Sequence, residues 1–232
     1  MRILGLIPAR GNSKGVAKKN IKLLCGKPLI QYTSEVALSS KLIDKVIVST
    51  DDEDIAKVSN SLGLEVPFIR PKEIANDESP TIDVIKHAIE FYRKKNVVYD
   101  AVCLLQVTSP LRTVQHLDDC IGKFIDTGCD TLISVVEVPH HYNPHWVFEE
   151  DNEGLLSIST GEKEIIPNRQ KLPKSFYRDG SIYLIRTETI INHKKIFGEK
   201  ISYVENPNTT QLNIDSMNDW IKAEKYFLKK NG

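Results

Sequence analysis

Short apolar runs alternate with amphipathic segments along the first part of the chain. Four runs read as buried strands, at Ile3–Ile7, Lys45–Ser49, Ala101–Leu105 and Thr131–Val138. The segments between them carry apolar residues on one helical face, which predicts helices at Leu29–Leu38, Ile55–Leu62, Thr81–Tyr92 and Thr113–Ile125. Strands that are apolar throughout, each followed by a helix, predict an α/β fold. Its mostly parallel sheet has helices on both faces, which makes three layers.

The loops that follow the strands are the expected place for a ligand. The carboxyl ends of parallel strands lie along one edge of a sheet, where ligands bind in folds of this kind. We count Val66–Ile69 as a further apolar run of the sheet. We therefore expect the loops after Ile7, Ser49, Ile69 and Leu105 to share one crevice.

The pattern changes from about Pro139 onward. Residues 140–146 are aromatic and rich in turn formers, and residues 151–173 are polar and do not read as core. Strand character returns at Ser181–Ile185, and Met217–Leu228 reads as a closing helix. We therefore expect one domain over residues 1–232 with a small protruding lobe at about 139–175.

The charge balance limits the partners of this chain. Its 232 residues include 31 basic and 31 acidic side chains, a formal net charge of zero, whereas binders of nucleic acid or acidic membranes usually carry a basic excess. No stretch approaches the roughly 20 apolar residues of a membrane span. The four cysteines show no zinc-ligand spacing and read as reduced thiols. We expect a soluble cytoplasmic protein that binds neither nucleic acid nor membrane.

The segment Ile7–Asn20, IPARGNSKGVAKKN, is the main chemical signal. A buried strand leads into a loop that contains glycines and several cations. Glycine lets backbone N–H groups approach an anion, and Arg and Lys neutralise phosphate charge. The spacing is neither that of a P-loop nor that of a dinucleotide-binding G-x-G-x-x-G loop. The loop predicts a phosphate site, and the alternative is an ordinary basic surface loop.

Several motifs in order resemble those of one enzyme family. They are the loop just described, Ile21–Ile30 with its G-K-P-L-I ending, VIVSTDDEDIA at Val46–Ala56, FIRPKEIANDESPTIDVI at Phe68–Ile85, LLQVTSPLRT at Leu104–Thr113, NRQKLPKSFYRDGSIYLI at Asn168–Ile185 and NIDSMNDW at Asn213–Trp220. Together they resemble the acylneuraminate cytidylyltransferases (CMP-sialic acid synthetases). The resemblance covers almost the whole chain. It implies a Rossmann-like fold, CTP as donor, Mg²⁺ or Mn²⁺ as metal, and a homodimer formed through the lobe.

The resemblance also implies a reaction and residue roles. In the family, the anomeric hydroxyl of a 2-keto nonulosonic acid attacks the α-phosphate of CTP and pyrophosphate leaves. The implied catalytic residues are Arg10, Lys14 and Asp215. The implied nucleotide site comprises Ala9, Arg10, Gly11, Ser13, Lys14, Lys19, Asn20, Arg70, Ser79 and Thr81. The implied acceptor-sugar site comprises Gln106, Arg169, Gln170, Asp179 and Tyr183, and the implied metal ligands are Asp215 and Asn213.

Two positions depart from the family pattern. The family usually has D-x-D before the last helix, whereas this chain has Asn213-Ile214-Asp215, so one ligand brings no charge. The family usually has Asn before the glycine where this chain has Asp179-Gly180. The additional carboxylate would either repel the sugar carboxylate or accept hydrogen bonds from a different substituent, which suggests an altered acceptor preference.

Alternatives stay open at this point. The acceptor is N-acetylneuraminate, legionaminate, pseudaminate or the deaminated acid, or else another acidic sugar, as in Kdo-type enzymes. The chain could also be a nucleotide-binding homologue without turnover. The acidic run Thr50–Asp54 reads as a helix N-terminus rather than a second metal site. Three histidines, His140, His141 and His145, are irregularly spaced and fit a lobe or interface better than a metal site.

Overall fold

The computed structural model describes residues 1–208, 210 and 212–231. Its central sheet has six strands in the order β10 (Ile201–Glu205), β6 (Thr131–Glu137), β9 (Phe176–Arg186), β5 (Ala101–Leu105), β1 (Ile3–Pro8) and β4 (Lys45–Ser49). Strand β1 runs parallel to β4 and β5, and β9 runs antiparallel to β5. The predicted α/β fold with a mostly parallel sheet is confirmed.

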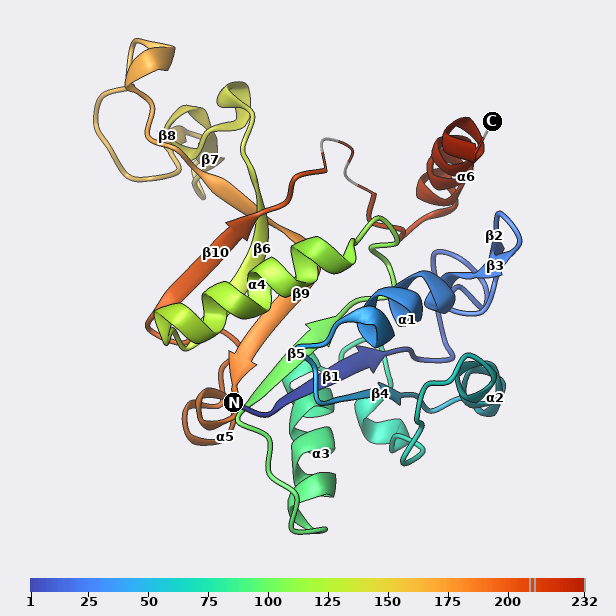
Figure 1. Cartoon of the computed structure of the whole chain (residues 1–232). Coiled ribbons are helices and arrows are strands. Elements are labelled where there is room, and N and C mark those ends of the chain that lie inside the picture. Colours follow the sequence, from blue (N-terminus) through green and yellow to red (C-terminus); the bar gives the residue numbers. More distant parts are fainter. Residues whose placement is uncertain (209, 211, 232) are drawn as a thin grey trace. The chain divides into compact units, whose positions relative to one another are not determined.

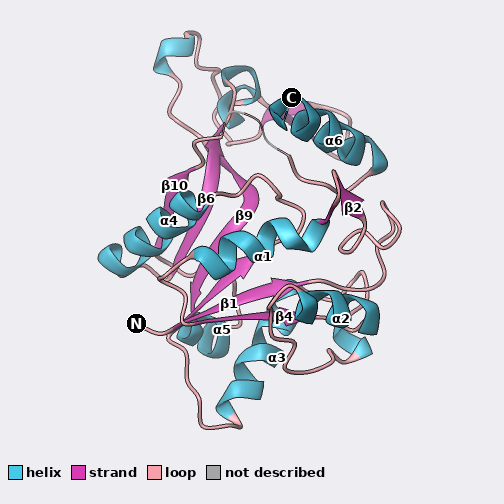
Figure 2. Ribbon diagram, turned by 45° about the vertical axis from the view of Figure 1, so that its right-hand side comes forward, coloured by secondary structure: helices cyan, strands magenta, loops and turns pink. Residues whose placement is uncertain are grey.

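Helices cover both faces of this sheet (Figures 1 and 2). One face packs against α1 (Leu29–Ser39), α2 (Glu53–Ser61), α4 (Val114–Thr127) and α6 (Met217–Asn231). The other face packs against α3 (Thr81–Arg93) and α5 (Thr187–His193). Along β1, Ile3 and Ile7 belong to the first core cluster, and Leu4 and Leu6 belong to the second. An all-apolar strand is therefore required because both of its faces are buried.

Local sequence sets the starts of two helices on the first face. The carboxylate of Asp52 accepts the main-chain N–H of Ile55 at 2.9 Å, so the acidic run after β4 caps α2 as expected. The hydroxyl of Thr113 caps α4 in the same way by accepting the N–H of His116 at 3.2 Å.

The expected strand at Val66–Ile69 is wrong. This segment makes two isolated parallel bridges beside β4, between Ile47 and Glu65 and between Thr50 and Ile69, and it forms no continuous strand. Pro67 lies between the two bridges and has no N–H to donate, which accounts for the interruption.

The chain divides into two compact units, Met1–Ser134 with Asp179–Gly232, and Val135–Arg178. The second unit contains the lobe expected at 139–175. It includes a short hairpin of β7 (Phe148–Glu150) and β8 (Leu156–Ile158) and a single helical turn at Arg169–Lys171. The first unit also has a small hairpin, β2 (Leu23–Leu24) with β3 (Lys27–Pro28).

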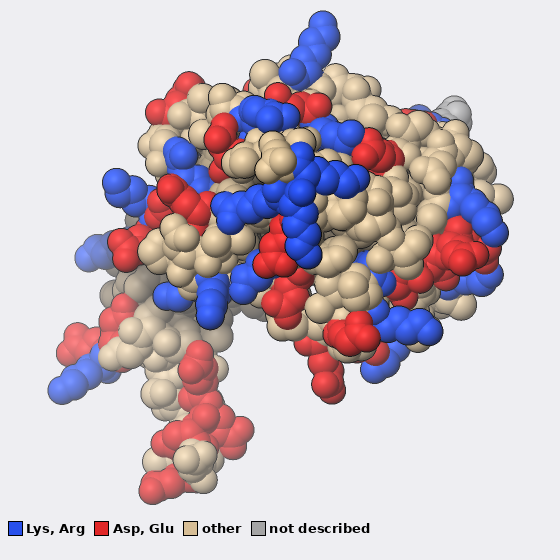
Figure 3. All heavy atoms as spheres, turned by 90° about the horizontal axis from the view of Figure 1, so that it is seen from below, with Lys and Arg blue, Asp and Glu red and all other residues tan. Residues whose placement is uncertain are grey.

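The surface carries charges of both signs. Figure 3 shows Lys and Arg interspersed with Asp and Glu on the face that it draws. Within the described part of the chain, the helices are too short or too polar to cross a bilayer. All four cysteines are free thiols.

Candidate active site

The cationic loop lies at the carboxyl edge of the sheet, where β1 ends. Ala9 is buried, and its N–H donates to the carbonyl of Ser49 at 3.0 Å, which joins the start of the loop to the end of β4. The N–H of Gly11 donates to Asp51 at 3.0 Å. A Cβ on Gly11 would stand 2.7 Å from the carboxylate of Asp52, so this close approach requires glycine.

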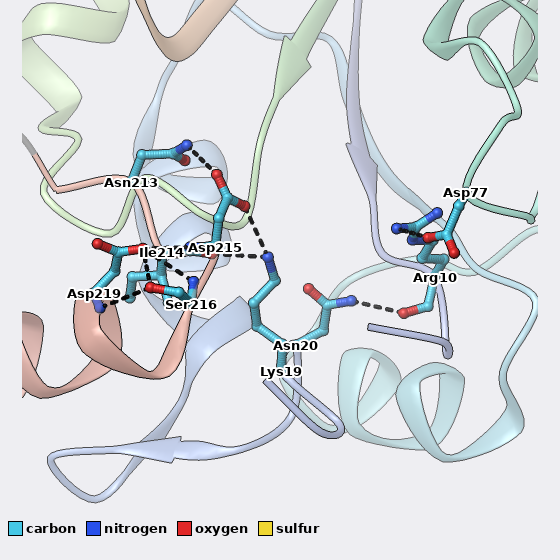
Figure 4. A network of polar contacts seen from close by, with 9 residues as sticks. All are labelled: Arg10, Lys19, Asn20, Asp77, Asn213, Ile214, Asp215, Ser216 and Asp219. Atoms are coloured by element: carbon cyan, nitrogen blue, oxygen red, sulfur yellow. Dashed lines mark hydrogen bonds and ion pairs between the residues drawn. The ribbon is translucent and has the colours of Figure 1, made fainter. Parts of the chain in front are cut away.

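Two cations of the loop share one carboxylate, and Figure 4 shows the first of these pairs, Arg10 with Asp77. The guanidinium of Arg10 lies 2.5 Å from Asp77, and the ammonium of Lys14 lies 2.7 Å from the same side chain. The hydrogen bond from Lys14 and the nearby charge of Arg10 lower the pKa of Asp77. Asp77 was not expected in this role, because a partner so far from Arg10 along the chain leaves no periodic signal in the sequence.

The end of the loop meets a segment from the far end of the chain. The ammonium of Lys19 donates to the carbonyl of Ile214 at 2.8 Å and to the carboxylate of Asp215 at 3.1 Å. Figure 4 shows these groups side by side. A Cβ on Gly15 would overlap with the carbonyl oxygen of Asp215, so the backbones are in direct contact there. Loop and segment are therefore packed as one site.

The two predicted metal ligands point toward each other. The side-chain amide of Asn213 donates to Asp215 at 2.5 Å. The side chain of Asp215 is 63% exposed, which leaves it open to solvent and ligands. The neighbouring Asp219 is used differently: it accepts the N–H of Ser216 at 3.0 Å, and Ser216 accepts the N–H of Asp219 at 3.3 Å, which forms a capping box at the start of α6.

Asn20 and Arg70 support the loop. The amide of buried Asn20 donates to the carbonyl of Arg10 at 2.9 Å. Arg70 is 5% exposed, donates to the carbonyl of Ser49 at 3.1 Å and lies 3.9 Å from Asp51. Burial lowers the pKa of Arg70, and the charge of Asp51 opposes that shift. Asp51 thus contacts both Arg70 and the N–H of Gly11, a link that the sequence did not reveal.

The remaining predicted nucleotide residues lie in the same unit. Ser13 is a half-buried residue of the loop. The hydroxyl of Ser79 accepts the N–H of Asn76 at 3.1 Å, and Thr81 is the first residue of α3. The segment that joins Arg70 to Thr81 therefore carries Asp77 to the cations of the loop.

The predicted acceptor residues are spread over the two units. Gln106 is half-buried just after β5, and its carbonyl accepts from the guanidinium of Arg112 at 2.7 Å. Arg169 and Gln170 are exposed in the second unit, where Arg169 lines a pocket of about 450 Å³. Tyr183 is 6% exposed in the core cluster beneath α3, on β9. A buried core position offers a sugar little surface.

Asp179 is surrounded by donors from the protein. It accepts from the hydroxyl of Ser134 at 2.8 Å, from the N–H of Ser181 at 2.9 Å and from the amide of Asn206 at 2.5 Å. Arg112, which is 5% exposed, donates twice to the carbonyl of Ser181, at 3.0 Å and 2.6 Å. Burial lowers the pKa of Arg112 to about 10, so it remains a cation at neutral pH.

The donor set at Asn213 and Asp215 suits a cation that prefers oxygen ligands, such as Mg²⁺ or Mn²⁺, better than one that prefers nitrogen or sulfur. Among the described residues, no three His, Cys, Asp or Glu side chains group as metal ligands. One carboxylate and one amide oxygen are hard ligands, and Mg²⁺ commonly takes one or two carboxylates together with phosphate oxygens and water. The residues present fit a metal that is held mainly by a bound triphosphate.

The fold and this edge of the sheet define a Rossmann-like α/β protein with a cationic loop and a carboxylate-bearing segment in contact. A family model described as Cytidylyltransferase matches residues 4–223. The chain belongs to the cytidylyltransferase family, and it is a nucleotidyltransferase by that membership.

Three relatives sharpen the comparison, and two of them are of similar length to this chain. The pseudaminic acid cytidylyltransferase of Campylobacter jejuni is 32% identical over 231 residues, which cover 100% of this chain and 98% of that protein. The CMP-N,N'-diacetyllegionaminic acid synthase of Legionella pneumophila is 34% identical over 228 residues, 97% of this chain and 96% of that protein. The N-acylneuraminate cytidylyltransferase of Escherichia coli is 32% identical over 99% of this chain and 53% of its own length.

A solved structure shares the fold. The CMP:2-keto-3-deoxy-manno-octonic acid synthetase complexed with CTP superposes with a TM-score of 0.74 at 17% identity, and covers 99% of this chain and 100% of that chain. At this identity the likeness speaks for the fold alone.

Proposed function

We propose that this chain transfers CMP from CTP to a nonulosonic acid and releases pyrophosphate. An acceptor hydroxyl oxygen forms a bond to the α-phosphorus, the bond from that phosphorus to the bridging oxygen breaks, and the acceptor proton passes to solvent or a nearby base. Two relatives that match over nearly their full lengths are named for pseudaminic and legionaminic acid. These two acids are therefore the first acceptors to test, ahead of N-acetylneuraminate.

One observation carries the proposal: the contact of Lys19 with Asp215 at 3.1 Å, across 196 positions of sequence. It joins a cationic loop to an exposed carboxylate at the edge of a parallel sheet. Transfer at an α-phosphate depends on charge neutralisation and in-line positioning more than on covalent chemistry. Arg10, Lys14 and Lys19 supply positive charge for the triphosphate and for the leaving pyrophosphate.

Asp215 and Asn213 would hold the divalent cation together with phosphate oxygens. Bound there, Mg²⁺ or Mn²⁺ supplies Lewis-acid polarisation of the phosphoryl group. Lys19 then keeps its contact with the carbonyl of Ile214 and fixes the backbone beside the carboxylate. The segment from Arg70 to Thr81 lies beside the loop and would bind the cytosine and ribose.

Arg169 offers a cation for the sugar carboxylate. It lines the pocket of about 450 Å³ in the second unit, together with His140, Asn143 and Lys174. A guanidinium binds a carboxylate through two parallel hydrogen bonds, which gives both affinity and orientation. Gln106, in the first unit, is the other acceptor contact that the resemblance implies.

A homodimer is part of the proposal. The second unit exposes several large apolar side chains, Tyr142 (66%), Leu155 (62%), Leu156 (68%), Ile165 (49%) and Tyr177 (43%). Apolar side chains gathered on a unit as small as Val135–Arg178 are typical of a surface that a partner covers. A second copy of this chain is the occupant that the resemblance implies.

Pyrophosphate release tests the proposed function. The purified chain is given CTP, Mg²⁺ and, one at a time, pseudaminate, legionaminate, N-acetylneuraminate and the eight-carbon acid Kdo. We expect release with a nine-carbon acid, and loss of metal-dependent release in Asp215→Ala. Arg169→Ala should raise the acceptor KM and leave the CTP KM unchanged. CTP binding without release for any acid would reject the proposal in favour of a non-catalytic homologue.

A further inference from the structure

Both oxygens of the Asp179 carboxylate accept hydrogen bonds from neighbouring residues of the described part of the chain. One oxygen accepts the N–H of Ser181, and the other accepts from Ser134 and Asn206, so each neighbour is a donor. The hydroxyl of Ser134 also contacts the ring of His116 at 2.7 Å. Because its neighbours are hydrogen-bond donors, the protein itself favours a carboxylate at position 179.

The cavity beside Asp179 is small. The cavity there measures about 10 Å³ and is lined by Ser109, Arg112, Asp179, Ser181 and Asn206, among others. A cavity of this size has room for about one water molecule. The buried hydroxyl of Ser109 has no hydrogen-bond partner among the described residues, and such a water would satisfy it.

Asp179 instead begins a series of contacts toward the C-terminal segment. Asn206 donates to Asp179 through its amide nitrogen, and its amide oxygen accepts the N–H of Asn208 at 3.0 Å. The amide of Asn208 in turn donates to the carbonyl of Leu111 at 2.9 Å. The segment 206–208 is thereby fastened to the loop that follows β5.

A second fastening lies next to the proposed metal ligand. The N–H of Ile214 donates to the carbonyl of Thr108 at 2.9 Å, in the same loop. The carbonyl of Ile214 accepts from Lys19. The place of Asp215 therefore depends on where the loop 106–112 lies, because Ile214 is attached to it directly and residues 206–208 are attached to it on the other side.

The loop itself is held by the same group of residues. The guanidinium of Arg112 bridges the carbonyls of Gln106 and Ser181 and contacts the hydroxyl of Thr33 at 3.2 Å. Ser181 consequently donates to Asp179 through its N–H and accepts from Arg112 through its carbonyl.

We infer that Asp179 is a positioning residue, which through Asn206 holds the segment that carries Asp215 against the cationic loop. It acts on the metal and nucleotide side of the site rather than on the acceptor. The inference rests on the proposed function only for the role of Asp215 as a metal ligand. The attachment of the segment stands on the hydrogen bonds themselves.

A charge-conserving exchange of the two side chains tests this. In Asp179→Asn, the remaining oxygen keeps the N–H of Ser181, and the new amide group faces the amide group of Asn206, donor against donor. In Asn206→Asp, two carboxylates meet. In the double variant, the amide introduced at position 179 would donate to the carboxylate introduced at position 206. That carboxylate would still accept the N–H of Asn208, so the link is rebuilt in the opposite direction.

Two readouts do not depend on turnover. The first is the rate of hydrogen exchange at the backbone amide of Ile214. The second is the affinity for Mn²⁺ in the presence of CTP, measured from the concentration of Mn²⁺ that stays unbound. We expect each single variant to accelerate exchange and weaken Mn²⁺ binding about fivefold or more, and the double variant to restore both. Asp130→Asn, which alters a carboxylate that accepts the N–H of Lys200, is the matched control and should change neither.

The outcomes separate this inference from the proposed function. Unchanged exchange and Mn²⁺ affinity in both single variants, or a double variant no better than either, would overturn it. A higher acceptor KM as the sole effect of Asp179→Asn would return Asp179 to the sugar site. If the wild-type chain releases no pyrophosphate with any acid, the proposed function fails while the exchange data still test the attachment. Should Asp179→Asn fold poorly, Asn206→Ala probes the same link from its other side.

Discussion

Asp77 holds the two cations that the proposed reaction assigns to the triphosphate. It lies between Arg10 and Lys14, and their hydrogen bonds and charge lower its pKa. A triphosphate that binds those cations has to displace this carboxylate or share them with it. The internal ion pair therefore opposes nucleotide binding, and the size of that opposition is measurable.

Asp77→Asn should bind CTP more tightly than the wild-type chain. Both ion pairs of Asp77 are exposed to solvent and individually weak, so their loss predicts a modest gain in CTP affinity, about two- to tenfold. Titration calorimetry with CTP at two salt concentrations measures the gain and its screening. Asp54→Asn, which removes only the exposed pair with Lys18 at 3.2 Å, is the control. Unchanged or weaker binding by Asp77→Asn would mean that this carboxylate does not compete with the nucleotide.

The buried side chain of His116 makes the free energy of unfolding depend on pH. Burial lowers its pKa, and the charge of Asp179 opposes that shift. Below about pH 6.5 the unfolded chain takes up a proton at this position that the folded chain resists. Protonation therefore favours the unfolded state, and the contribution of this group to stability falls as the pH falls.

His116→Gln should flatten the acid side of the stability profile. Glutamine can donate to Ser134 and does not titrate, so the difference in slope between the two proteins isolates this histidine. The wild-type free energy of unfolding should fall more steeply below about pH 6.5, by at most about 1.4 kcal/mol per pH unit. Urea unfolding at intervals from about pH 7.5 to about pH 5 measures it. If the unfolding free energies of the two proteins fell with pH at the same slope, His116 would have the same pKa in the folded and unfolded chain, which would contradict the prediction.

Among the secondary-structure elements, the strands that are buried on both faces of the sheet were predicted correctly from their apolar sequences. The apolar runs at β1, β4, β5 and β6 were confirmed nearly to the residue. Strand β10 was missed because its side chains alternate between exposed and half-buried at the edge of the sheet. The antiparallel direction of β9 also leaves no mark in its own residues, since direction is set by the path of the chain.

Gly15 fixes the distance between the loop and the segment that carries Asp215. Because a Cβ there would overlap with a backbone oxygen, Gly15→Ala must push the two apart. We expect the contact of Lys19 with Asp215 to be lost and cytidylyl transfer to fall by about tenfold or more, on the order of the loss of one preorganised charge contact. Steady-state pyrophosphate release measures the effect.

Gly122→Ala is the matched control for that substitution. Gly122 lies inside α4, and nothing stands within 4 Å of its added Cβ. This variant should keep full activity and gain roughly 0.5–1 kcal/mol in stability, because alanine favours the helix. Equal activities for Gly15→Ala and the wild-type chain would contradict the packing of loop and segment described above.

For the molecule as a whole, the oligomeric state can be tested directly. The exposed apolar side chains of the unit Val135–Arg178 predict a dimer that forms through this unit. Light scattering coupled to gel filtration should give twice the chain mass for the wild-type protein. Leu156→Asp should shift it to the monomer, whereas Leu228→Asp, similarly exposed on α6 in the other unit, should not. A monomeric wild-type chain would refute the dimer.

The candidate site could be read from the sequence only in part. The loop Ile7–Asn20 is contiguous, so its glycines and cations identify it without a structure. The contact of Asp215 with Lys19, the pairing of Asp77 with two cations and the donors around Asp179 each join positions far apart in the chain. Such contacts depend on the folded path of the chain, so the sequence did not reveal that Asp179 accepts hydrogen bonds from Ser134, Ser181 and Asn206.

A nucleoside triphosphate should bind between the cationic loop and Asp215. A crystal of the chain grown with CTP and Mn²⁺ tests it most directly, because the anomalous signal locates the metal independently of the nucleotide density. We expect a manganese peak beside Asp215, with the triphosphate in contact with Arg10 and Lys14 in place of Asp77. Nucleotide or manganese bound elsewhere on the molecule, with the contacts of Arg10, Lys14 and Asp215 unchanged, would contradict it.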